Sequence, residues 1–257
     1  MAFINIGFFS KALGMEVTCN VILPQPVHPE DAQDKLPVLW LLHGAYGNYA
    51  DWMRRTSIER YVANTGLCVV MPSAQNSDYT DMVHGGRFYT YISSELPERM
   101  RSFFPLSQRR EDNYICGLSM GGAGAFKIGL SKPDHYAAIG CLSAGAQNKG
   151  GRLIRMMGSL IYGDTPCEGT YMDPLSQADK ILAAGGPFPR IYHTCGSEDS
   201  LLVNAHEARD YFSAIPGNPF DYVYEEDEGA HTWGYWDEHI RRFLQYLHVE
   251  KKPDIFY

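Results

Sequence analysis

The chain has 257 residues, enough for one large α/β domain, and we expect residues 1–257 to form a single domain. Its formal net charge is −8, from 22 basic and 30 acidic residues, which argues against nucleic acid or an anionic membrane as a partner. A small neutral or modestly polar substrate is more compatible with this charge. No segment approaches the roughly 20 apolar residues that a membrane-spanning helix needs.

Segments typical of strands and of helices alternate along most of the chain. Residues 3–9 and 15–23 are rich in β-branched and aromatic side chains and predict an antiparallel hairpin at the start. Further strands are expected at 38–42, 67–71, 113–116, 136–142, 190–194 and 220–225. Helices are expected at 51–64, 89–104, 120–131, 175–184, 203–215 and 234–247. This alternation predicts an α/β fold with a mostly parallel central sheet and helices on both faces.

Some boundaries have specific residue signals. Asp51 is expected to cap the first helix, and Gly66 is expected to end it. Pro97 falls inside the second helical segment, which must either tolerate it near one end or kink there.

The most informative stretch is the strand-to-helix junction at residues 113–124. Gly117, Ser119 and Gly121 have the Gly-x-Ser-x-Gly spacing of a nucleophile elbow, in which a strained turn pushes the serine hydroxyl out of the sheet. The glycines leave room where the turn approaches its neighbours. An ordinary glycine-rich turn is the alternative, and the strand before and the helix after the serine argue against it.

A serine hydroxyl needs a base within hydrogen-bonding reach and an acid that orients the base. Such groups come from loops at the carboxyl ends of parallel strands. Asp199 follows the expected strand 190–194, and His231 follows the strand 220–225. The order serine, acid, base is the one expected after a nucleophile elbow, so we predict a triad of Ser119, Asp199 and His231.

Each partner has an alternative. Of nine histidines, only His231 follows the last strand in a Gly-Ala-His sequence, whereas a histidine taken at random more often has a structural role. Glu198 competes with Asp199, and we favour Asp199 because the fourth residue of the turn that begins at Gly196 should lie over the strand end. Asp199 could instead cap the helix that follows it.

The backbone after the serine and after strand 38–42 could stabilise an oxyanion. The N–H of Met120 is available at the start of the elbow helix, and we choose the N–H of Ala45 as the second donor, with Gly44 giving a flexible approach. His43 is expected to orient this loop rather than to act as the base.

The remaining site residues are expected in loops. Residues 73–88 form a long loop, and loops of this length are usually functional or mobile. Substrate-binding residues are expected to be Gly44, Tyr79, His84, Tyr89 and Trp233, although each aromatic residue taken alone fits simple packing equally well. Residues 146–173 are glycine-rich, with a helical patch at 153–161, and we expect a small insertion that lies over the site.

Cofactors are not expected. The sequence has no His-Glu-x-x-His, no Cys-x-x-Cys pair, no dinucleotide fingerprint and no phosphate-binding loop motif, so we expect neither a metal nor an organic cofactor. Six cysteines are too few for a disulfide scaffold, and five of them lie in expected strands as buried thiols: Cys19, Cys68, Cys116, Cys141 and Cys195. Together with the absence of an Asn-x-Ser/Thr sequon and of a basic, apolar leader in residues 1–11, this favours a cytoplasmic location.

Six motifs together resemble the esterase-D-like α/β-hydrolases, most of all the bacterial tributyrin esterases. They are His-Gly-Ala-Tyr-Gly-Asn at 43–48, Tyr-Thr-Asp-Met at 79–82, Glu-Leu-Pro at 95–97, Gly-Leu-Ser-Met-Gly-Gly at 117–122, Gly-Ser-Glu-Asp at 196–199 and Gly-Ala-His-Thr-Trp at 229–233. The resemblance implies an α/β-hydrolase fold and a metal-free serine esterase for short-chain acyl esters, including acetyl or feruloyl esters of carbohydrates. It also assigns the nucleophile, acid and base to Ser119, Asp199 and His231.

Three other functions stay open. S-formylglutathione hydrolases belong to the same group, but they usually carry Ser-Gly where this chain has His43-Gly44. An acyltransferase would use the same triad with an alcohol in place of water. A non-catalytic binding module is expected to have a broken triad, and here all three members are present. The partner is expected to be a small ester, and a homo-oligomer is compatible with the sequence.

Overall fold

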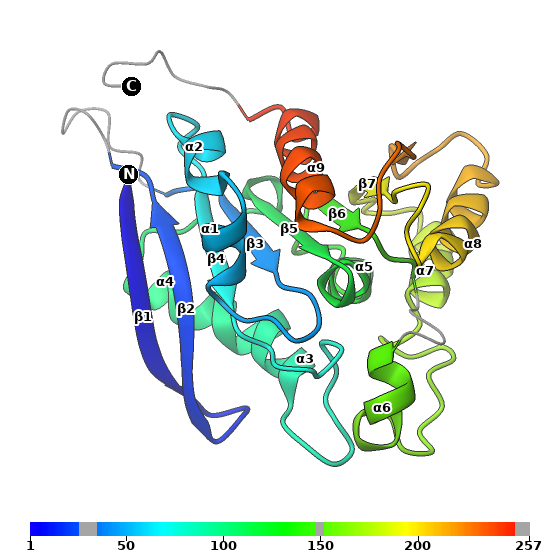
Figure 1. Cartoon of the computed structure of the whole chain (residues 1–257), viewed down its shortest axis with the longest axis horizontal. Helices are drawn as coiled ribbons and strands as arrows, with labels where there is room; N and C mark the ends of the chain where they lie inside the picture. Colours follow the sequence, from blue (N-terminus) through cyan, green and yellow to red (C-terminus); the bar gives the residue numbers. More distant parts are fainter. Residues whose placement is uncertain (26–34, 147–151, 250–257) are drawn as a thin grey trace.

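A computed structural model of the chain describes residues 1–25, 35–146 and 152–249. One eight-stranded sheet has the order β1-β2-β4-β3-β5-β6-β7-β8 (Figure 1). The strands are β1 (Ala2–Ser10), β2 (Met15–Leu23), β3 (Val38–Leu42), β4 (Cys68–Pro72), β5 (Asn113–Leu118), β6 (Ala138–Leu142), β7 (Arg190–Thr194) and β8 (Val223–Glu225). Strand β2 pairs antiparallel with β1 and β4, and the other pairs are parallel. The expected mostly parallel sheet with an N-terminal hairpin is confirmed.

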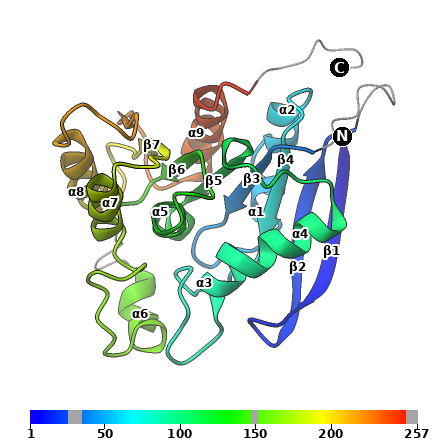
Figure 2. The same ribbon diagram turned by 180° about the vertical axis from the view of Figure 1, so that it is seen from behind.

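Helices cover both faces of this sheet. They are α1 (Asp51–Arg55), α2 (Ile58–Val62), α3 (Phe88–Thr90), α4 (Leu96–Phe103), α5 (Met120–Ser131), α6 (Arg152–Ile161), α7 (Pro174–Ala184), α8 (Leu202–Ser213) and α9 (Trp233–Tyr246). Helices α1, α2 and α9 pack on one face, and Figure 2 shows α4 crossing the other face, where α5 also lies. Helix α6 belongs to the expected insertion, of which residues 147–151 lie outside the described part of the chain.

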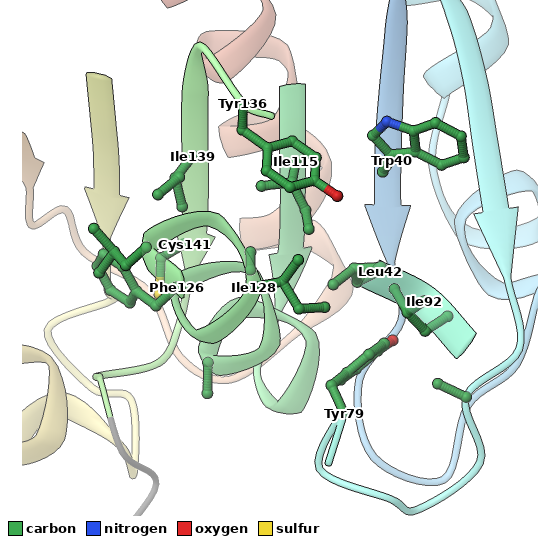
Figure 3. Packing of buried hydrophobic residues seen from close by; sticks show 14 of the residues in the cluster. Trp40, Leu42, Tyr79, Ile92, Ile115, Phe126, Ile128, Tyr136, Ile139 and Cys141 are labelled. Atoms are coloured by element: carbon green, nitrogen blue, oxygen red, sulfur yellow. The ribbon is translucent and has the colours of Figure 1, made fainter. Parts of the chain in front are cut away.

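The two cores follow from the alternation of side chains along the buried strands. In β3, Leu39 and Leu41 point into the core beneath α1, α2 and α9, whereas Trp40 and Leu42 point into the core on the face that α4 and α5 cover. Figure 3 shows Phe126 and Ile128 of α5 packed in that second core. Strand β3 is buried on both faces, and a strand in this position needs apolar side chains at every residue, as its sequence has.

The expected helix 51–64 is instead two short helices. Thr56 is extended between them, and the N–H of Ser57 donates to the carboxylate of Asp237 at 2.9 Å. A side chain 180 positions further along therefore interrupts the helix. Asp51 is the first helical residue rather than the cap.

The expected helix 89–104 is present with an irregular middle. A π-helical turn, Tyr91–Glu95, separates α3 from α4, and Pro97 lies in the first turn of α4. Because proline has no N–H, a regular α-helical hydrogen-bond ladder cannot pass through position 97, and the wider turn precedes it.

The last strand is shorter than expected. The sequence predicts a strand at 220–225, but Asn218 and Asp221 have φ angles of 45° and 44°, so β8 starts only at Val223. Phe220 is buried against Phe212, and its carbonyl accepts the N–H of Ile191 in β7 at 3.0 Å although it lies outside β8.

All six cysteines are free, and the five expected to be buried are buried. Cys195 follows β7 by one residue and is not part of a strand. Within the described residues, no helix has the length and apolar character needed to cross a membrane.

Two buried histidines make the stability depend on pH. His193 donates from Nε2 to the carbonyl of Ala144 and accepts at Nδ1 from Tyr222, and burial lowers the pKa of His193 from 6.5 to about 4. Burial and then the charge of Arg242 lower the pKa of His239 to about 4 as well. The unfolded chain therefore binds more protons than the folded chain between these two pH values, and stability is lost as the pH falls through that window.

We expect the free energy of unfolding to drop as the pH falls from 6.5 toward 4, by up to roughly 3 kcal/mol for each histidine, at about 1.4 kcal/mol per pH unit. Urea unfolding between pH 7 and 5 measures the slope before most carboxylates titrate. A His193→Gln variant, which keeps a donor for the Ala144 carbonyl, should have a shallower slope. A slope that this substitution leaves unchanged would contradict the assignment.

Candidate active site

Ser119 lies on a strained turn between β5 and α5. Its φ and ψ are 53° and −120°, in the region that side chains other than glycine avoid. The neighbouring glycines permit this turn: a Cβ at Gly117 would lie 2.3 Å from the carbonyl oxygen of Gly121, and one at Gly121 would lie 2.6 Å from that of His43. The expected strand-turn-helix context of the serine is therefore present.

Three side chains expected at the site form one hydrogen-bonded chain. Nε2 of His231 lies 2.9 Å from Oγ of Ser119, and Nδ1 lies 2.9 Å from both carboxylate oxygens of Asp199. Because a carboxylate only accepts, Nδ1 donates to Asp199 and Nε2 is left to accept from the Ser119 hydroxyl. This arrangement lets the imidazole of His231 accept the proton of the Ser119 hydroxyl.

Asp199 is held as a buried carboxylate. Its exposed fraction is 5%, and Oδ1 also accepts the N–H of Leu201 at 2.8 Å. Burial alone would raise the pKa of Asp199, but the hydrogen bond and charge of His231, the Leu201 N–H and the Ser143 hydroxyl together lower it. Its rival Glu198 is exposed.

Ser143 and Trp236 support the site and were not expected from the sequence. Ser143 follows β6 with a φ of 52°, accepts from Nε1 of Trp236 at 2.9 Å, and hydrogen-bonds Asp199. The indole of Trp236 packs edge-on against the His231 ring, with 4.9 Å between centroids. The sequence signal for Ser143 was its position directly after the expected strand 136–142, and Trp236 had no such signal.

The loop after β3 lies against the serine. A Cβ at Gly44 would lie 2.5 Å from Leu118 and 3.5 Å from Cβ of Ser119, so glycine allows this close approach. His43 holds the loop, because Nδ1 donates to the Gly44 carbonyl at 2.7 Å and Nε2 accepts the N–H of Ala74 at 2.8 Å. Burial lowers the pKa of His43, which favours this neutral form.

A cavity of about 420 Å³ opens over Ser119. Its walls come from the loop after β3, α1, the loop 73–88, the elbow, the start of α6, the segment before α8, and the loop before α9 with the first turn of that helix. The lining residues are 44–47, 51, 55, 78, 118–120, 152–154, 200–201, 231, 233 and 236. Gly44, Ala45, Met120 and Trp233, which the sequence analysis singled out, are among these lining residues. The start of α6, which falls within residues 146–173, therefore forms part of the wall.

Three expected substrate-binding residues do not line this cavity, which corrects the sequence-based expectation. Tyr79 is fully buried, and its hydroxyl donates to the His43 carbonyl at 2.9 Å. His84 is exposed, with its N–H bound to the carbonyl of Leu160. Tyr89 stacks on Tyr171 with 3.8 Å between ring centroids. The side chains of Tyr79 and Tyr89 and the backbone of His84 thus contact neighbouring segments rather than the cavity.

One group of potential metal ligands occurs among the described residues. Glu225, Asp227 and His239 have ligand atoms within 4.8 Å of one another. The guanidinium of Arg242 already binds both carboxylates, with Nη1 at 3.1 Å from Glu225 and a short contact to Asp227. A cation of the protein therefore occupies this position.

The sheet, its helices and the strained serine turn define an α/β-hydrolase fold with the site geometry of a serine hydrolase. Residues 10–247 match a family model for esterases, described as "Putative esterase". An acetyl esterase of Caldicellulosiruptor saccharolyticus is 32% identical, over 96% of this chain and 98% of that protein.

Two solved structures from Staphylococcus aureus agree with this match. The fluorophosphonate-binding serine hydrolase FphF has 32% identity and a TM-score of 0.85, over 97% of this chain and 99% of that one. The S-formylglutathione hydrolase FrmB has 33% identity and a TM-score of 0.84, over 96% and 98%. The chain belongs to the esterase family, as an esterase-D-like serine esterase, and it is a carboxylic-ester hydrolase.

Proposed function

We propose that the protein hydrolyses short-chain acyl esters through a triad of Ser119, His231 and Asp199 and a covalent acyl-enzyme. The observation that carries this proposal is the position of His231, which holds the serine hydroxyl at one ring nitrogen and a buried carboxylate at the other. A carboxylate, imidazole and hydroxyl in this order activate serine for attack on an ester carbonyl.

The proposed reaction has two halves. Oγ of Ser119 attacks the ester carbonyl while Nε2 of His231 takes its proton, and Asp199 stabilises the imidazolium. The N–H groups of Met120 and Ala45 stabilise the tetrahedral oxyanion. When this intermediate collapses, the imidazolium gives its proton to the departing alcohol and the acyl group stays on Ser119. Water then attacks the acyl carbonyl by the same route, which releases the acid and restores the serine.

The proposed substrates are esters of acetyl and other short acyl groups. Acetyl or feruloyl esters of carbohydrates are included. The similarity to an acetyl esterase supports this class. S-formylglutathione is a second candidate because a hydrolase of that thioester is 33% identical. Transfer of the acyl group to an alcohol is a third, since it needs no change in the triad.

A substrate panel tests the proposal. We expect kcat/KM to be highest for p-nitrophenyl acetate or butyrate, in keeping with the similarity to an acetyl esterase, and about tenfold lower for the octanoate. Feruloyl esters and S-formylglutathione belong in the same panel. A rate that rises with chain length to octanoate would contradict the short-chain proposal. Faster turnover of S-formylglutathione than of any ester would replace it with the second candidate, and acceptor-independent acyl release would exclude transfer.

We also propose that the enzyme works in the cytoplasm as expected from its cysteines. Burial raises the pKa of Cys19 and of Cys68 to about 12, so both remain protonated and unreactive at neutral pH. Free thiols of this kind suit a reducing compartment.

A further inference from the structure

A buried ion pair lies beside the cavity and is not used by the proposed chemistry. Nζ of Lys127 lies 2.9 Å from Oδ2 of Asp78, and the two side chains are 3% and 7% exposed. The ammonium also donates to the Asp78 carbonyl at 2.5 Å and to Oγ1 of Thr80 at 2.8 Å, so all three of its hydrogen atoms have acceptors. Such a pair is costly to bury and is poor evidence of stabilisation by itself, so its placement needs another explanation.

The same carboxylate binds the insertion. The hydroxyl of Tyr162, the residue after α6, makes a short hydrogen bond to Oδ2 of Asp78. Burial and then the charge of Asp78 raise the pKa of Tyr162 well above its ordinary value, so the phenol stays a donor. The N–H groups of Val83 and His84 also donate to the carbonyls of Ile161 and Leu160, so the end of α6 is bound to the loop 73–88.

The ion pair therefore joins three elements around the cavity. Lys127 lies on α5, the helix that begins directly after Ser119, and Asp78 lies in the loop 73–88 and lines the cavity. The start of α6 contributes residues 152–154 to the lining of the same cavity. Asp78 and Tyr79 both have positive φ angles, 50° and 51°, which place one side chain on Lys127 and the other under the His43 carbonyl.

We propose that Tyr162, Asp78 and Lys127 act as positioning residues that fix α6 relative to the serine and thereby set which acyl groups the cavity accepts. This inference rests on the proposed function, because it assigns the α6 wall to substrate selection in that site. Lys127 neutralises Asp78 whether or not the insertion is in place, and Tyr162 supplies the contact that depends on the position of α6.

Tyr162→Phe tests this directly, because it removes one hydroxyl and leaves the ion pair satisfied. We expect KM for p-nitrophenyl butyrate to rise about threefold to tenfold, the change that corresponds to one net hydrogen bond, with kcat within about twofold. The preference for acetate over octanoate should narrow, because the wall can move away from longer chains. Asp78→Asn should shift KM and selectivity in the same direction.

Tyr61→Phe is the matched control. Its hydroxyl also donates to a carboxylate, that of Asp237, at 2.9 Å between two helices, but Tyr61 does not line the cavity. We expect this variant to keep the wild-type KM and selectivity. The inference is wrong if Tyr162→Phe has the same KM and the same chain-length selectivity as Tyr61→Phe. It is also wrong if Tyr162→Phe loses kcat while KM is unchanged. Undiminished ester turnover by Ser119→Ala would instead reject the proposed function, so the two failures are distinct.

Discussion

Ser119→Ala is expected to lower kcat for p-nitrophenyl acetate by about 10⁴-fold to 10⁶-fold. The hydroxyl at the end of the hydrogen-bonded chain is the group that attacks, and neither His231 nor Asp199 can replace it. The fold should persist, because only one oxygen atom is removed and alanine at φ 53° is no bulkier than serine. Steady-state kinetics measure the loss, and thermal unfolding checks that the variant is folded.

The size of the residual rate is informative. The oxyanion donors and the cavity remain in Ser119→Ala, so slow hydrolysis above the rate in buffer is compatible with the mechanism. Turnover by the folded variant within tenfold of the wild-type rate would contradict the mechanism, because another group would then have to attack the ester.

Asp199→Asn is expected to lower kcat by about 10³-fold to 10⁴-fold. Asparagine has nearly the same shape, but its amide can leave the proton on Nε2 of His231, the nitrogen that must accept from Ser119. The substitution also removes the negative charge that stabilises the imidazolium. The same kinetic assay, run with Glu198→Gln as control, measures this effect.

The control separates the two acidic residues in the turn after β7. Glu198 is exposed, whereas Asp199 contacts His231 with both carboxylate oxygens. We therefore expect Glu198→Gln to change kcat by less than about twofold. A large loss in Glu198→Gln with near-normal activity in Asp199→Asn would reverse the assignment.

The parts of the site that the sequence predicted depend on local rules. The turn at Ser119 was predictable because its glycines and the change from strand to helix lie within twelve residues. Placing Asp199 and His231 needed only the rule that parallel strands end at one edge, which brings loops after β7 and β8 together. The buried run of β3 likewise follows from local apolar sequence.

The walls of the cavity were less predictable because they depend on contacts between distant segments. Tyr79 and Tyr89 are residue types that often line binding sites, yet Tyr79 contacts the His43 carbonyl and Tyr89 stacks on Tyr171. The helix break before α2 depends in the same way on Asp237. The segment with a helical patch at 153–161 was expected over the site, but it carries no motif that indicates which of its residues line the cavity.

The proposed mechanism requires that a single serine, activated by its neighbours, becomes covalently bound to the reagent that it attacks. Intact-mass spectrometry after treatment with a fluorophosphonate tests this most directly, with peptide mapping of the adduct. We expect one adduct for each chain, located on Ser119, and no adduct in Ser119→Ala. An unlabelled wild-type protein that still hydrolyses esters, or an adduct on another residue, would contradict it.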